Sequence, residues 1–86
     1  MRLDKFLKVS RLIKRRTLAN EACDRGLVTL NGRVAKAGAL VRPGDVLALR
    51  LGSRLIKVEV LAVEESVPAK DASGMYRLIA DERISE

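Results

Sequence analysis

Residues 17–32, TLANEACDRGLVTLNG, decide the fold because the spacing of their apolar residues changes part-way along. In the first half, Leu18, Ala19 and Ala22 recur at helical spacing, so these side chains are expected to face the core. From Val28 onward, apolar and polar residues alternate as they do in a half-buried strand. The stretch therefore predicts a helix that is followed directly by the first strand of a sheet.

Both ends of this helix carry terminal signals. Thr17 is a predicted N-cap because its hydroxyl can accept a hydrogen bond from a free N–H group of the first turn. Gly26 follows Arg25 and is a predicted stop, since glycine readily adopts the positive φ that ends many helices. The helix is expected over about residues 17–25.

Downstream of this helix, short apolar segments separated by turn residues predict an antiparallel sheet. Asn31-Gly32 predicts a type I′ hairpin turn, because both central residues of that turn need a positive φ. The remaining expected elements are a turn at 42–45, strands at 46–51, 56–62 and 75–80, a loop at 64–74 and a frayed polar tail to residue 86.

Upstream, Leu3, Phe6 and Leu7 follow the i, i+3, i+4 spacing of a helix face and predict a short amphipathic helix over 2–9. A basic connector over 10–16 joins it to the next helix. The order of elements predicts an α+β fold, with two short N-terminal helices packed on a small antiparallel sheet of four to five strands. At 86 residues, the chain is expected to form a single domain over 1–86.

The composition excludes several classes of function. The chain has no histidine and one cysteine, Cys23, so it has too few ligands for a structural zinc site and no partner for an internal disulfide. A Ser-His-Asp or Cys-His nucleophile is excluded as well. Phe6 and Tyr76 are the aromatic residues, too few for a platform that stacks several bases. We therefore expect no catalytic residue, no metal and no cofactor.

The positive charge is concentrated in the N-terminal half. The net charge is +6, of which residues 1–42 contribute +8 (eleven Lys and Arg against three acids) and residues 43–86 contribute −2 (six against eight). Seven basic residues lie within the first sixteen positions. A solvated helix face accounts for any one of these residues, but the concentration favours a polyanionic partner.

The predicted RNA-binding surface combines the first helix, the connector and the hairpin. Its members are Arg2, Lys5, Lys8, Arg11, Lys14, Arg15, Arg16, Arg33 and Lys36. Arginine forks match phosphate oxygens, and no helix-turn-helix or zinc finger is present to enter a DNA major groove. The predicted mode is recognition of the backbone and shape of structured RNA.

Asp4 is the acid among these cations, and two interpretations stay open. It can pair with Lys8 one helical turn away, or it can orient a neighbouring arginine toward RNA. Cys23 is expected to be a small core residue.

A membrane role is less favoured than a nucleic-acid role. The basic N-terminal helix also fits a membrane-surface helix, but Leu3, Phe6 and Leu7 give it a short apolar face. No secretory signal and no membrane span are present in the sequence. We therefore expect no membrane partner, a cytoplasmic location and a monomer.

Four segments carry a resemblance to a known RNA-binding domain. They are RLDKFL at 2–7, RTLA at 16–19, GLVTLNG at 26–32 and VRPGD at 41–45. Together they resemble the S4-like domain, named after a small-subunit ribosomal protein. The resemblance implies an S4-like core over 1–51, which leaves 52–86 for C-terminal strands and a polar tail.

A longer resemblance extends from RLDKFLKVSRLIKRRTLA at 2–19 to the strand at Met75-Tyr76. It is similar to the RqcP family of stand-alone bacterial quality-control factors, which are relatives of the fifteen-kilodalton heat-shock protein. This resemblance implies binding to large ribosomal subunits that carry peptidyl-tRNA, with contacts to large-subunit rRNA and P-site tRNA. It also implies RqcH as a candidate partner and support for alanine tailing of stalled chains.

The family's RNA contacts would fall on the basic residues of the helix and connector, with Asp4 orienting them. The family often has small hydroxyl residues after the position of Lys36, where this chain has Ala37-Gly38-Ala39. No hydroxyl contact with RNA is therefore expected at that loop. The alternatives are a heat-shock-type rescue factor that acts without tailing and a generic polyanion binder.

Overall fold

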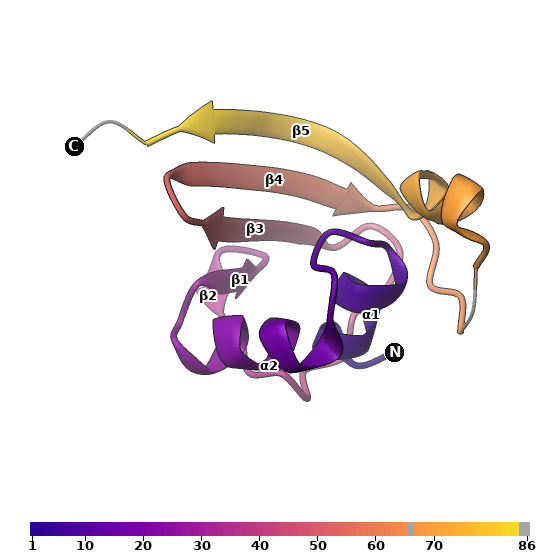
Figure 1. The fold of residues 1–86 in the computed structure, drawn as a ribbon, viewed down its shortest axis with the longest axis horizontal. Coiled ribbons are helices and arrows are strands. Elements are labelled where there is room, and N and C mark those ends of the chain that lie inside the picture. Colours follow the sequence, from indigo (N-terminus) through magenta and orange to yellow (C-terminus); the bar gives the residue numbers. More distant parts are fainter. Residues whose placement is uncertain (66, 85–86) are drawn as a thin grey trace.

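The two α-helices lie against one side of a five-stranded antiparallel sheet (Figure 1). The computed structural model describes residues 1–65 and 67–84. Its elements are α1 (Leu3–Val9), α2 (Arg16–Asp24), β1 (Val28–Leu30), β2 (Arg33–Val34), β3 (Val46–Leu51), β4 (Arg54–Val60), the 3-10 helix η1 (Ala69–Met75) and β5 (Tyr76–Arg83). The strand order is β2-β1-β3-β4-β5. The predicted α+β fold is confirmed.

Helix α1 forms where the apolar spacing predicts it. Leu3, Phe6 and Leu7 are fully buried, and they pack in one core with residues of α2 and of the sheet. Ser10 follows the helix, and its buried hydroxyl donates to the Leu7 carbonyl at 3.3 Å. Burial of one face fixes the opposite face of α1 toward solvent.

Helix α2 begins at Arg16, one residue earlier than the sequence predicts. Thr17 lies inside the first turn and, among the residues that the structure describes, no side chain caps the helix, so the prediction of Thr17 as N-cap is wrong. Leu18 is 49% exposed, so its predicted place in the core is also wrong. The buried stripe of α2 consists of small residues: Ala19, Ala22 and Cys23. Leu18 precedes this stripe by one position, about 100° around the helix.

The predicted turns are confirmed by their backbone conformations. Gly26 has φ 74° and ends α2, with its N–H group donating to the Cys23 carbonyl at 3.0 Å. Asn31 and Gly32 have φ 51° and 86°, the positive values that the hairpin turn requires. The hairpin turn joins β1 to β2, which pair antiparallel, and β1 also pairs antiparallel with β3.

The C-terminal part is more ordered than the sequence predicts. β3 has its predicted bounds, and β4 occupies 54–60 rather than 56–62. The expected loop at 64–74 contains η1. β5 continues to Arg83, so the prediction that the strand ends at residue 80 and a frayed tail follows is wrong for residues 81–83. Residues 85–86 lie outside the described part. Cross-strand pairing with β4 stabilises this polar strand, as the ion pair between Arg54 and Asp81 illustrates.

Within residues 1–65 and 67–84, neither α-helix has the length or the apolar composition of a membrane-crossing segment.

Candidate RNA-binding surface

Asp4 is a buried charge at the contact between α1 and α2. The residue is 2% exposed. Its carboxylate accepts hydrogen bonds from Arg2 Nε at 3.2 Å, from Arg16 Nη2 at 3.4 Å and from the Lys5 backbone N–H at 2.8 Å. Arg2 precedes α1 and Arg16 opens α2, so this one carboxylate holds together the N-terminal ends of both helices.

This geometry decides between the two interpretations of Asp4. Its ion pairs in the described part of the chain are with Arg2 and Arg16, so the predicted pairing with Lys8 is wrong. The alternative, that Asp4 orients a neighbouring arginine, agrees with the contacts. That the arginines are oriented toward RNA stays a prediction.

Asp4 stays ionised in spite of its burial. Burial alone would raise the pKa of this carboxyl, because a charge is less stable away from water. Hydrogen bonds from Arg2, Arg16 and Asn20, together with the charge of Arg16, outweigh that effect and lower the pKa below its ordinary value. The cluster is therefore two cations and one anion near neutral pH, with a net charge of +1.

Asn20 also belongs to this cluster and was not among the predicted site residues. Its side chain helps to lower the pKa of Asp4, and it lines a hollow of about 340 Å³ with Asp4, Arg16 and Thr17. Arg16 and Asn20 are one helical turn apart and lie on the same face of α2. That spacing was the available signal, but it does not indicate that Asp4 is the partner.

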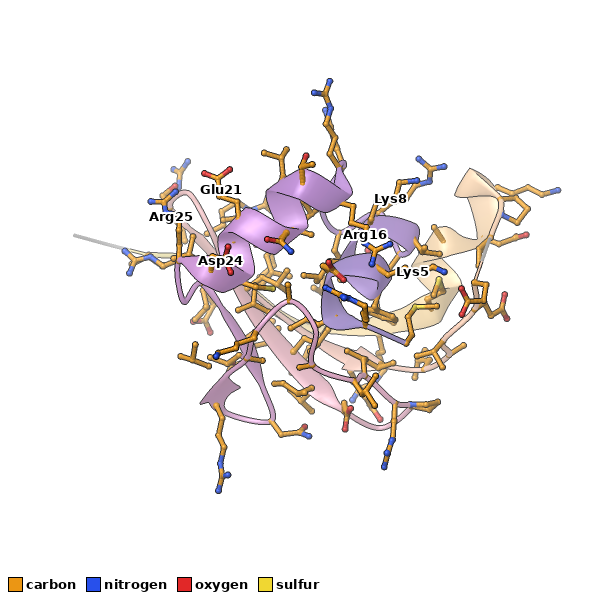
Figure 2. All side chains as sticks on the ribbon, turned by 90° about the horizontal axis from the view of Figure 1, so that it is seen from below. Lys5, Lys8, Arg16, Glu21, Asp24 and Arg25 are labelled. Carbon is orange, nitrogen blue, oxygen red and sulfur yellow. The ribbon has the colours of Figure 1, made fainter. Side chains whose placement is uncertain are left out.

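The other cations of α1 differ in their surroundings. Lys8 is exposed, whereas the Lys5 ammonium forms an ion pair with Glu65, in the segment between β4 and η1. Lys5 also lowers the pKa of Glu65 through this hydrogen bond. Figure 2 separates two groups of labelled side chains: Lys5, Lys8 and Arg16 near the start of α2, and Glu21, Asp24 and Arg25 at its far end. Along α2, the labelled cations are therefore separated from an end of mixed charge that contains two acids and Arg25.

The connector presents Arg11, Lys14 and Arg15, which are all exposed. Among the residues that the structure describes, no carboxylate lies within ion-pair distance of these three cations. Arg11 has φ 65°, a left-handed conformation that non-glycine residues seldom adopt. The chain thus turns sharply after α1 and presents cations throughout the turn.

The loop that contains Lys36 lies against the start of α1. The Asp4 N–H donates to the Ala37 carbonyl at 3.1 Å, and the Arg2 guanidinium lies 3.9 Å from the point where a Cβ on Gly38 would be. Arg33 and Lys36 are exposed and share a hollow of about 620 Å³ with Gly38. The structure therefore brings the loop that contains Lys36 beside Arg2 at Gly38, with Arg33 on the edge strand β2.

Cys23 is buried, as predicted for a small core residue. Burial raises the pKa of its thiol, and the charges of Asp4 and Asp24 raise it further, so the thiol is a poor nucleophile. No group of three or more potential metal ligands occurs within the described residues.

Comparison with known proteins identifies the family of this chain. The family model described as "S4 domain" matches residues 1–47. The chain is 56% identical over 86 residues to the "RQC P-site tRNA stabilizing factor" of Halalkalibacterium halodurans, covering 100% of this chain and 98% of that one. The protein of the same name from Bacillus subtilis is 49% identical, and 100% of both chains is covered. The chain belongs to the RQC P-site tRNA stabilizing factor family. Family membership confirms the resemblance inferred from residues 2–19.

The structure of heat shock protein 15 from Vibrio cholerae, which is described as trimeric, has the same fold as this family member. Its TM-score is 0.86 at 32% sequence identity, covering 93% of this chain and 82% of that one. The predicted relationship between this family and heat shock protein 15 is therefore confirmed.

Proposed function

We propose that this chain is a non-enzymatic, cytoplasmic RNA-binding factor of ribosome-associated quality control. It binds large ribosomal subunits that carry peptidyl-tRNA, contacts rRNA and P-site tRNA, and supports alanine tailing together with RqcH. It acts as a monomer in which residues 1–86 form one module. The name of its relatives, and identity of 56% over the whole chain, support a role at the P-site tRNA.

The pair of arginines held by Asp4 carries this proposal. Two guanidinium groups brought together repel each other unless an anion lies between them, and Asp4 is that anion. The side chains of Arg2 and Arg16 remain 52% and 48% exposed. Each therefore keeps N–H donors for a phosphate outside the cluster, and its orientation is set before RNA arrives.

The remaining cations extend the area of phosphate contact and add no other kind of interaction. They are Lys5, Lys8, Arg11, Lys14, Arg15, Arg33 and Lys36. Contacts of this kind fix the position of an RNA by its phosphates and shape rather than by its base sequence. Stabilising a bound tRNA needs such positioning and no bond-breaking step, which supports a non-enzymatic role.

The test is co-sedimentation with purified large subunits that carry peptidyl-tRNA. Arg16→Ala removes one charge-assisted contact, so we expect roughly tenfold weaker binding with the fold intact. Arg25→Ala is the matched control, because Arg25 is an exposed arginine at the opposite end of α2 (Figure 2). Co-sedimentation of Arg16→Ala at the wild-type level would refute the assignment of this surface.

A heat-shock-type rescue factor is the second candidate, favoured by the TM-score of 0.86 to heat shock protein 15. Alanine tailing reconstituted with and without the chain separates the two roles. Equal tail lengths in both reactions favour rescue without tailing. Equal affinity for anionic vesicles, duplex DNA and large subunits would instead indicate a generic polyanion binder.

A further inference from the structure

The helices leave part of the sheet uncovered beside β5. Figure 1 shows β5 at the edge of the sheet, on the side away from α2. Leu78 of β5 pairs in register with Val58 of β4. Val58 is fully buried, whereas Leu78 is 53% exposed. The apolar face of the sheet therefore continues beyond the helical layer.

A groove of about 490 Å³ lies on this uncovered face, a volume within the range of about 300–1,000 Å³ that is usual for ligand sites. Arg11 and Leu12 of the connector form part of its lining. The two strands contribute Ile56, Tyr76 and Leu78. Tyr76 is half-buried, so it supplies one aromatic side chain to an otherwise aliphatic surface.

The charged groups of the groove leave a net positive charge. The Asp81 carboxylate is already paired with Arg54, whose Nε donates to it at 3.1 Å. Within the described part of the chain, Arg11 has no carboxylate partner. The groove thus offers one free cation beside apolar surface, together with a fixed donor–acceptor pair.

The backbone at Arg11 is a second, independent observation. At φ 65°, glycine would be less strained than any residue with a side chain. Strain that is kept in a folded chain is concentrated at functional sites. An arginine nevertheless occupies this turn, so we infer that its side chain has a functional role.

We propose that the groove binds one unpaired nucleotide of the bound RNA. Its base packs against Tyr76 and Leu78, and its phosphate pairs with Arg11. This proposal rests on the proposed RNA-binding function. A flat base with polar edges fits the mixture of apolar floor and Arg54–Asp81 pair. An apolar peptide would instead leave the Arg11 charge buried without a partner.

The neighbouring cations favour RNA as the source of that nucleotide. Lys14 and Arg15 lie on the same connector as Arg11 and are exposed. An RNA strand whose phosphates follow these cations reaches the groove without leaving the proposed surface. The site thereby adds a preference for an unpaired base to a surface that otherwise recognises backbone and shape.

The test compares two fluorescent RNA probes by equilibrium anisotropy: a blunt-ended stem, and the same stem with a single-stranded tail of four uridines. The variant Leu78→Gln makes the groove polar without changing its charge. We expect about fivefold weaker binding of the tailed stem, the low end of base-stacking effects, and unchanged binding of the blunt stem. Arg11→Gly, which relieves the backbone strain but removes a cation of the proposed surface, should weaken binding of both stems, and of the tailed stem more than of the blunt stem.

Ile79→Gln is the matched control. Ile79 is 44% exposed but lines a different hollow, with Leu55 and Lys57 on the other face of the ribbon. If Leu78→Gln weakens neither probe, or weakens both equally, the groove proposal is wrong while the proposed function stands. If the wild-type chain binds neither probe, the proposed function fails and the groove proposal with it. A change in molecular mass of Leu78→Gln in sedimentation equilibrium would show that a second copy covers the groove, which also overturns the proposal.

Discussion

Replacing Asp4 by asparagine tests the central arrangement of this surface. The substitution keeps the size of the side chain and an acceptor for the Lys5 N–H, which donates at 2.8 Å. It removes the charge that Arg2 and Arg16 contact at 3.2–3.4 Å. The change thus isolates the electrostatic role of Asp4 from its packing.

Removing one partner of a buried ion pair costs about 3–5 kcal/mol. Here the guanidinium groups are 52% and 48% exposed and can regain water, so a smaller loss is expected. Two stretched, charge-assisted hydrogen bonds that are partly replaced by water contribute roughly 1–2 kcal/mol. In a chain of this size the melting temperature should fall by about 4–16 °C.

The effect of Asp4→Asn on RNA binding has a diagnostic sign. Net charge alone predicts tighter binding, because the variant is more positive. Loss of arginine orientation predicts weaker binding, roughly tenfold for one charge-assisted contact. Glu65→Gln is the charge-matched control, since it also removes one acid but releases Lys5 from its ion pair, and it should bind more tightly.

The assays are thermal unfolding followed by circular dichroism and RNA binding at fixed salt. The pKa of Asp4 is lower in the folded chain than its ordinary value of 3.8, so its stabilising contribution is complete above that value. The difference in stability between wild type and Asp4→Asn should be constant from about pH 8 to pH 5 and shrink as pH falls below it. An unchanged melting temperature together with unchanged or tighter RNA binding would refute the reasoning.

Three further predictions concern other parts of the chain. A plot of log RNA affinity against log salt concentration, measured by titration, should have a slope that is smaller in magnitude by roughly 0.7–0.9 for Arg16→Ala than for wild type. An unchanged slope contradicts a phosphate contact. Cys23 should react with a thiol reagent far more slowly in the native chain than in denaturant, and equal rates would contradict its burial. Asn31→Ala should lower the free energy of unfolding in urea by about 1–2 kcal/mol, because it removes two hydrogen bonds and leaves a non-glycine residue at positive φ. Asn31→Gly should lower the free energy of unfolding less than Asn31→Ala does, and an equal loss in the two variants would exclude a contribution from φ.

Local signals in the sequence were enough for the elements that local chemistry determines. Asn31-Gly32 forms the expected hairpin turn and Gly26 ends α2. These turns could be predicted because the ability to adopt a positive φ is a property of the residue itself and needs no distant partner. The apolar face of α1 was also predictable, since Leu3, Phe6 and Leu7 are buried on one side. For the site, the same pattern placed Lys8 among the exposed cations.

Features that depend on long-range partners were not predictable. The periodicity of α2 admits Leu18 to its apolar face, but close packing selects the small residues Ala19 and Ala22. The polar C-terminal residues resemble a tail until β4 supplies Arg54 as the partner of Asp81. Asp4 likewise has local candidate partners in Arg2 and Lys8, and it pairs with Arg2, whereas its second partner Arg16 becomes a neighbour only when α2 packs on α1.

The contact between α1 and the loop at 36–41 also sets the order in which this surface can assemble. α1 is seven residues long, and an isolated helix shorter than about 12–15 residues is marginal in water. Its first N–H groups donate to the Ala37 and Ala39 carbonyls, and the Val41 N–H donates to the Met1 carbonyl. During synthesis these partners emerge well after the helix that needs them. A growing chain therefore exposes a basic segment whose first turn is not yet held by the 37–41 loop.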